Sequence, residues 1–303
     1  MQTPKFAGRL ARDFGERAGR SLAKQVHLPY VGPVGLWVIL FVVVPLGFII
    51  YFSFVTIGPF GKIIPTFTLK NYQTAMAAGY GRILLRSFLF AAVTNVLCLL
   101  IGYPLAYWIV KYGGKWETLL LLLIILPSWT NYLIRLYAVK LIIGSSGLIN
   151  SALLNLGLIS SPLQILYTPY AVILGLVHVW LPFMVLPIYA SLKGLDPSLF
   201  EASADLGAAP FKTFSTVTLP LTRGGILAGT ILVFIPSLGE WLVPLMLGGG
   251  KVMLAGSLVQ HFFIKLGNAP MGSTIATFLI AAILLVVYVC FKLGGRETLE
   301  RVI

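Results

Sequence analysis

Residues 191–223 read SLKGLDPSLFEASADLGAAPFKTFSTVTLPLTR and separate two long apolar runs. Asp196 suits the N-cap of a helix, because its carboxylate can accept hydrogen bonds from the free backbone N–H groups of the first turn. Pro197 suits the first helical position, and Gly207 can adopt the left-handed conformation that ends a helix. The pattern predicts a helix of about ten residues, roughly 15 Å long. Its broad face would carry Leu199, Phe200, Ser203 and Leu206.

A second helix is expected to begin at Pro210 and to be closed by Leu219 and Pro220. Two connected helices in a polar segment could dock in a groove on a soluble partner and pass that partner's motion into the rest of the chain. An interfacial loop that only fills space explains the residues equally well. The residues alone leave these two interpretations equal.

The apolar runs around this segment predict an all-α integral membrane protein. Of the 303 residues, 58% are hydrophobic and 10% are charged, whereas charged residues make up about a quarter of a soluble domain. A helix needs about 20 apolar residues to cross the hydrocarbon of a membrane. We expect a six-helix domain over residues 33–293. Its predicted transmembrane helices are 33–54, 86–110, 118–137, 170–190, 224–247 and 273–293.

Most of these predicted spans contain proline. In lipid, a proline break survives only where neighbouring helices or a cavity satisfy the freed backbone groups. The sequence therefore predicts a packed bundle with a pathway through it, rather than isolated anchors. The prolines are Pro45, Pro104, Pro127, Pro182, Pro187, Pro236 and Pro244.

The distribution of Lys and Arg predicts that both termini are cytoplasmic, because this orientation places most of the 22 basic residues inside. The net charge of +13 does not indicate nucleic-acid binding, since the basic residues border apolar runs and form no stripe. In the basic segment 1–32, apolar residues recur every four positions. This spacing favours an amphipathic helix on the inner leaflet, held by membrane lipid, over a disordered tail. These apolar residues are Phe6, Leu10, Phe14, Ala18, Leu22 and Val26. Residues 294–303 would form a cytoplasmic tail.

The quoted segment resembles the EAA motif of ATP-binding-cassette (ABC) importer permeases, which reads E-A-A, three residues, G, nine residues, then I-x-L-P. Here Glu201-Ala202-Ser203 is followed by Gly207 and by Val217-Thr218-Leu219-Pro220. Ser203 replaces Ala and Val217 replaces Ile, while the spacing is intact. The resemblance implies a type I importer permease whose coupling loop, 195–220, docks on an ATPase that drives alternating access. The coupling residues that it implies are Glu201, Ala202, Ser203, Asp205, Gly207, Leu219 and Pro220.

The chain itself has no nucleotide-binding P-loop, which requires G-x-x-x-x-G-K-[ST]. Gly114-Lys115 and Gly250-Lys251 are each followed by the wrong residue and lack the earlier glycine. ATP and Mg²⁺ would thus be bound by a separate ATPase, and this chain is not expected to be an enzyme or to hold a cofactor. The spacing of its His and Cys residues predicts no metal site.

Four further stretches resemble the permease subunits of bacterial putrescine and spermidine importers. They are LIGYPLAYW (100–108), LPSWTNYLIRLYA (126–138), VWLPFMVLPIYASL (179–192) and IPSLGEWLVPLMLGG (235–249). The resemblance implies an inner-membrane protein that pairs with a second permease as a heterodimer, with two ATPase copies and a periplasmic binding protein. One alternative is the same kind of importer for a cationic amino acid, an opine or an iron complex. A stand-alone channel or secondary carrier is the other alternative, and the EAA-like segment argues against it.

A polyamine is a flexible apolar chain with ammonium groups at intervals. A passage for it should offer aromatic faces for cation–π contact and few fixed acids, because conduction requires weak binding. Trp129, Tyr132 and Arg135 are three residues apart, which places them near one helical face. Anchoring at the membrane interface, or packing, is the alternative role for each aromatic residue. The candidates for the pathway are Trp129, Tyr132, Trp180, Tyr189 and Trp241, with Glu240 as the acid.

Glu240 is the one acid that this orientation places beyond the inner face of the membrane. Pro236, Gly239 and Pro244 surround it, so we expect the helix to break there. An ionisable residue inside a membrane usually faces a cavity and marks a pathway. The alternative is a structural ion pair, for which Arg135 or Arg86 is the natural partner.

Overall fold

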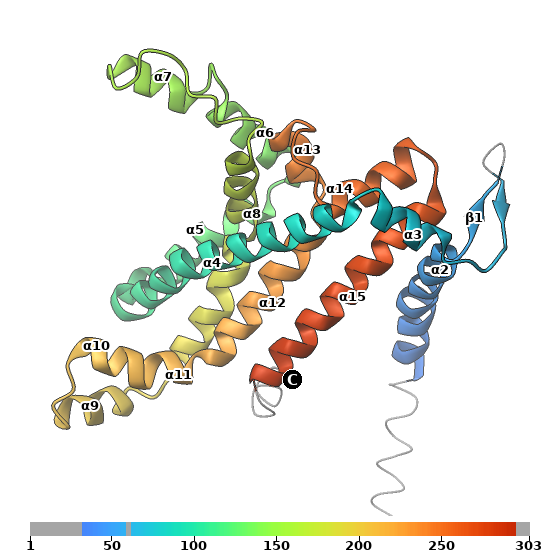
Figure 1. Cartoon of the computed structure of the whole chain (residues 1–303). Coiled ribbons are helices and arrows are strands. Elements are labelled where there is room, and N and C mark those ends of the chain that lie inside the picture. The colour runs from blue at the N-terminus through green and yellow to red at the C-terminus, as the bar shows by residue number, and fades with distance from the viewer. Residues whose placement is uncertain (1–31, 59–61, 295–303) are drawn as a thin grey trace, which may run out of the picture. The chain divides into compact units, whose positions relative to one another are not determined.

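The computed structural model describes residues 32–58 and 62–294, most of them in helices (Figure 1). The chain divides into two compact units, Met1–Phe52 and Ser53–Ile303. A helix from Gly32 runs through the first unit to Ser53, the first residue of the second, and is apolar enough to cross a membrane. It contains the π-helical turn η1 (Ile39–Val43) and α2 (Val44–Ser53). The wider turn lies just before Pro45, which cannot donate a helical hydrogen bond. The amphipathic segment and the tail predicted at the two ends lie outside the described residues, except for Gly32 and Gly294.

The second unit begins with a small β-hairpin that the sequence did not lead us to expect. Strands β1 (Thr56–Ile57) and β2 (Ile63–Ile64) pair in antiparallel register, Thr56 opposite Ile64. The side-chain amide of Asn71, in α3 (Lys70–Ala77), donates to the carbonyl oxygens of Ser53 and Val55 at 3.1 and 2.6 Å. These contacts join the hairpin to α3.

Three long helices form the centre of the second unit: α4 (Tyr80–Tyr112), α8 (Pro169–Lys193) and α12 (Arg223–Gly239). Figure 1 shows α9 and α10 near one end of α8, and α6, α7 and α13 near the other. The other helices that follow α4 in the chain are η3 (Gly114–Trp116), α5 (Glu117–Trp129), α6 (Tyr132–Ile143), α7 (Leu148–Asn155), α9 (Ser198–Asp205), α10 (Pro210–Thr213), η4 (Phe214–Thr218), α11 (Leu219–Leu221), α13 (Leu242–Gly248), α14 (Ala255–Gln260), η5 (His261–Lys265) and α15 (Ala269–Gly294).

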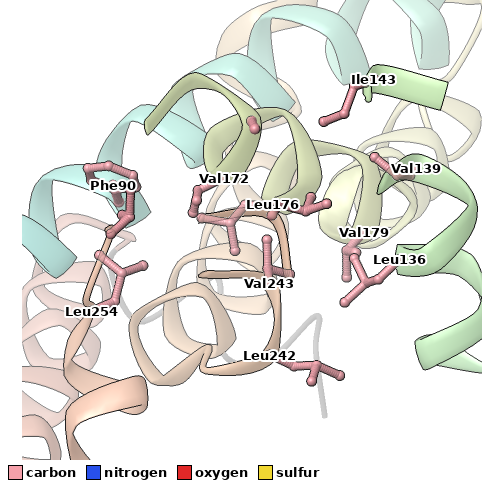
Figure 2. Packing of buried hydrophobic residues seen from close by; sticks show 13 residues of the cluster. Phe90, Leu136, Val139, Ile143, Val172, Leu176, Val179, Leu242, Val243 and Leu254 are labelled. Carbon is pink, nitrogen blue, oxygen red and sulfur yellow. The ribbon is translucent and has the colours of Figure 1, made fainter. Parts of the chain in front are cut away.

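Glycines let α12 approach α8 closely. A Cβ added at Gly225 would lie 2.5 Å from the carbonyl oxygen of Pro187, and one at Gly229 would lie 2.7 Å from Sδ of Met184. Nearer the N-terminal end of α8, a buried cluster joins α4, α6, α8 and α13. Figure 2 shows Val172, Leu176 and Val243 within this cluster. The cluster fixes α13 against α8, which positions the broken end of α12.

The described residues contain five helices that are long and apolar enough to cross a membrane, or six if one bent pair counts as a span. Two of the predicted spans are interrupted. The 224–247 span breaks at Glu240, as expected. The 118–137 span also breaks, because Thr130 is extended and the side chain of Asn131 begins a new helix by accepting from Leu133 and Ile134 N–H. Consequently α6 runs beyond the predicted end, to Ile143.

The coupling loop has the predicted pair of helices. Oδ1 of Asp196 accepts from the Ser198 N–H at 2.9 Å, and Gly207, with φ of +73°, follows the end of α9. The second helix begins at Pro210, as expected, but continues through the π turn η4 to Leu221. The chain then bends by 63° into α12.

Candidate functional site

A cavity of about 400 Å³ lies where α5, α6, α8 and α12 meet the residues before α13. It brings together four of the six residues predicted for the pathway, Tyr132, Trp180, Glu240 and Trp241, with Arg135 beside them. The other lining residues are Ser128, Val179, Phe183, Pro236 and Gly239. Polar and aromatic side chains thus gather at the two helix breaks, where backbone groups leave the helical pattern.

Glu240 occupies the break between α12 and α13 and is only 7% exposed. Its Oε1 accepts from the backbone N–H groups of Trp241 and Leu242 at 3.1 and 3.0 Å, so the carboxylate caps α13. Its Oε2 accepts from the hydroxyl of Tyr132 at 2.7 Å. A carboxylate that accepts from backbone N–H groups at the start of a helix is stabilised by the partial positive charge there.

The alternative role considered for Glu240, a structural ion pair with Arg135 or Arg86, is not formed in the described part of the chain. Among the described residues, neither guanidinium lies within ion-pair distance of Glu240. Arg135 donates from Nη1 to the carbonyl oxygen of Pro127 at 3.0 Å, and its guanidinium lies 5.5 Å from the centre of the Tyr132 ring. Arg86 instead lies over the ring of Phe90. Tyr132 and the amides of α13 satisfy the carboxylate, so it needs no arginine.

Two predicted pathway residues do not line the cavity. Trp129 is 76% exposed at the end of α5, and the break after it means that the helical row begins only at Tyr132. Tyr189 instead donates to Oε1 of Glu117 at 2.6 Å. Sequence reasoning missed Phe183, whose ring centre lies 5.5 Å from that of Trp180. Its spacing of three residues from Trp180 on α8 was the available signal.

Glu117 joins α5 to the end of α8 that leads into the coupling loop. Its Oε2 lies 2.8 Å from Nζ of Lys193 in an ion pair, and its Oε1 accepts from Tyr189. Hydrogen bonds from Lys193 and Tyr189 lower the pKa of Glu117 below its ordinary value. No sequence pattern predicts these contacts, because Glu117 lies 72 positions from Tyr189 and 76 positions from Lys193.

The coupling residues lie on an exposed hairpin of helices. Glu201, Ala202, Asp205 and Gly207 are exposed. Ser203 is 8% exposed, and its Oγ lies 2.6 Å from Oγ1 of Thr213 in α10. At the far end of the motif, Leu219 is exposed and Pro220 is half-buried.

Two large apolar side chains project from the same hairpin. Leu206 is 88% exposed and Phe211 is 80% exposed. The buried Ser203 therefore faces α10, while Leu206, which was predicted on the same broad face, points outward.

Comparison with known proteins places this fold. Residues 98–294 match the family model "Binding-protein-dependent transport system inner membrane component". The chain is 40% identical to the spermidine/putrescine transport system permease protein PotB of Haemophilus influenzae, over 86% of this chain and 92% of PotB. It is also 40% identical to PotB of Escherichia coli K12, over 83% and 92%. The inner membrane ABC transporter permease protein YdcU of E. coli is 32% identical, over 78% and 80%.

The fold is that of an ABC importer permease. A chain from the crystal structure of a bacterial ABC transporter that imports the acidic polysaccharide alginate superposes with a TM-score of 0.68 at 16% identity. The match covers 92% of this chain and 96% of that chain. With its apolar helices and EAA-like loop, the protein is a multi-pass inner-membrane protein and a translocation subunit. The chain belongs to the family of inner membrane components of binding-protein-dependent transport systems.

Proposed function

We propose that this chain is the permease subunit of an ATP-driven importer that moves putrescine or spermidine from the periplasm into the cytoplasm by alternating access. The observation that carries the proposal is the cavity, in which Tyr132, Trp180 and Trp241 surround Glu240, the single acid among its lining residues. The names of the PotB relatives support the same substrates.

The cavity suits a weakly held amine. Glu240 already accepts from Tyr132 and from the start of α13, but a carboxylate has about four lone-pair sites, so it can accept an ammonium group as well. Trp180 and Trp241 offer aromatic faces to the cation. Arg135 contributes a positive charge to the same lining, which opposes tight binding of an amine and favours its release.

The importer would contain subunits that this chain lacks. We propose a heterodimer with a second permease, two ATPase subunits that bind ATP and Mg²⁺, and a periplasmic binding protein. Both termini would be cytoplasmic, and segment 1–32 would lie on the lipid of the inner leaflet. The α9–α10 hairpin would dock on an ATPase, with Leu206 and Phe211 as apolar contacts.

The test is uptake by the complete complex, reconstituted in proteoliposomes with its binding protein and ATP. We expect ATP-dependent uptake of labelled putrescine or spermidine, and stimulation of ATP hydrolysis by the loaded binding protein. The matched control is the same complex without ATP. The polyamine assignment would be overturned if a solute without an amine group stimulated ATP hydrolysis and none of the amines tested did so.

A second candidate is an importer of the same kind for a cationic amino acid. Arg135 favours it, because the guanidinium lines the cavity and, among the described residues, has no carboxylate partner. It could therefore meet the carboxylate of an amino acid while Glu240 meets its ammonium. Measuring the uptake of arginine by the same reconstituted complex separates the two candidates. No observation favours an opine or an iron complex, and a stand-alone channel or carrier is inconsistent with the family.

A further inference from the structure

The joint between the coupling loop and α12 lies at Thr222, where the chain bends by 63°. Thr222 is fully buried, and its Oγ1 lies 2.8 Å from the hydroxyl oxygen of Tyr103 in α4. Oγ1 of Thr222 also lies 2.9 Å from the carbonyl oxygen of Thr218, to which it can donate. Tyr103, which lies 119 residues before Thr222 in the chain, thus connects α4 to the bend.

The aromatic ring of Phe214, in the coupling loop, packs against the same part of α4. The ring of Phe214 meets those of Tyr103 and Tyr107 edge to face, with centres 5.6 and 5.8 Å apart. Edge-to-face pairs of this kind add stabilisation beyond the area that they bury. Phe214 also begins the π turn η4, and such turns often mark functional positions in helices. Tyr103 therefore contacts the loop before the bend and the bend itself.

The start of α12 is packed tightly against α8. Gly225 follows the bend by three residues, and its backbone lies against the carbonyl oxygen of Pro187 and Oγ of Ser191 in α8. Close-packed helices of this kind resist compression and transmit strain to one another. A displacement of the coupling loop must therefore either move α12 together with α8 or be lost by flexing at Thr222.

We propose that Tyr103 and Thr222 form a rigid joint, which passes displacement of the α9–α10 hairpin to α4 and α12 together. This proposal rests on the proposed function, in which an ATPase moves that hairpin. Tyr103 is a positioning residue, since it acts through Thr222 and Phe214 and does not line the cavity. Without its hydrogen bond, the loop flexes at the bend and ATP is hydrolysed with less movement of the bundle.

The test compares Tyr103→Phe, which keeps the ring against Phe214, with Thr222→Val and the double variant. Thr222→Ser keeps the hydroxyl and is the matched control. In the complete reconstituted complex, we expect uptake per ATP hydrolysed to fall about fivefold in Tyr103→Phe and Thr222→Val. The double variant should be no worse than either single variant, and Thr222→Ser should retain the wild-type ratio.

Two outcomes would overturn the joint. One is an unchanged ratio of uptake to hydrolysis in Tyr103→Phe. The other is a proportional loss of both activities together with a lower melting temperature, which would mean that the contact only stabilises the fold. Failure of the proposed function is distinguishable, because the wild-type complex would then show no ATP-dependent uptake of any amine.

Discussion

The hydroxyl of Tyr132 in α6 donates to Oε2 of Glu240 at 2.7 Å, across 108 residues of sequence. The other oxygen of the same carboxylate caps α13. One buried side chain therefore holds the end of α12, the start of α13 and the face of α6 together, on the wall of the cavity. Its charge and its capping role can be separated, because a carboxamide also has an oxygen that can accept from backbone N–H groups.

We predict that Glu240→Gln separates these roles. The carboxamide oxygen keeps the cap on α13, so the melting temperature and assembly with the ATPase should stay near those of the wild type. The negative charge is lost, and uptake of putrescine or spermidine should fall by about tenfold, roughly 1.4 kcal/mol of cargo stabilisation. Melting curves of the purified complex and initial uptake rates provide the two measurements.

Glu240→Leu is the companion variant, since it removes both charge and cap. It should also lower the stability by about 0.5–2 kcal/mol, as loss of an N-cap does. Unchanged transport kinetics in Glu240→Gln would remove the charge of Glu240 from the mechanism and leave it as a cap alone.

The sequence predicted the break at Glu240 but not what the carboxylate does there. Pro236, Gly239 and Pro244 are local signals, and helix breaks depend mainly on local residues. The partner Tyr132 comes from another helix, and a single sequence contains no record of that proximity. An arginine was the natural guess for a buried acid, whereas backbone amides and a phenol meet the same need.

The second prediction concerns the N-cap of the coupling helix. The pKa of Asp196 is lowered from 3.8, chiefly by the hydrogen bond from the Ser198 N–H. Because the folded-state pKa is the lower one, the cap is complete at neutral pH and weakens only as the pH falls through that lowered value. We expect Asp196→Ala to expose α9 to faster hydrogen exchange at neutral pH, measured by mass spectrometry on the complete complex.

Asp196→Asn is the matched control, because its side-chain oxygen can still accept from Ser198 N–H. In that variant, protection of α9 from exchange should not change with pH once the intrinsic exchange rate is corrected. Equal protection in Asp196→Ala and the wild type would show that the cap does not hold the helix.

The coupling loop was the most predictable part of the molecule. Its helix start, its left-handed glycine and its second start at Pro210 are all set by residues within the loop. The 118–137 span was less predictable, because apolar periodicity alone does not show the break at Thr130 and Asn131. Trp129 was therefore placed beside Tyr132 on one helix, although the two belong to different helices.

The third prediction concerns the contact of α12 with α8. Gly225→Ala places a methyl group 2.5 Å from the carbonyl oxygen of Pro187, a backbone atom that cannot move aside easily. We expect a loss of about 1–3 kcal/mol of stability, as for other overpacked sites, measured as a lower melting temperature. Gly239→Ala in the same helix meets nothing within 4 Å and should melt at or slightly above the wild-type temperature. Equal melting of the two variants would contradict the close packing.

The fourth prediction concerns the position where the motif departs from the family pattern. Ser203 replaces the alanine of the EAA motif, and its Oγ lies 2.6 Å from Oγ1 of Thr213. The hydroxyl pair ties α9 to α10 and so fixes the exposed hairpin on which Leu206 and Phe211 project. We expect Ser203→Ala and Thr213→Val each to weaken ATPase binding to the permease by about fivefold, because each leaves one hydroxyl without its partner.

The double variant decides between a specific tie and two independent polar residues. If the hydroxyls act as a pair, the double variant binds the ATPase about as well as either single variant, which gives a coupling energy of about 1 kcal/mol. Ser215→Ala is the matched control, since this exposed hydroxyl bonds only locally, to the carbonyl oxygen of Lys212. Its effect should add to that of Ser203→Ala. Strictly additive effects of Ser203→Ala and Thr213→Val would show that the two hydroxyls do not act as a pair in positioning the hairpin. Unchanged ATPase binding in Ser203→Ala would show that alanine and serine are equivalent at this place in the motif.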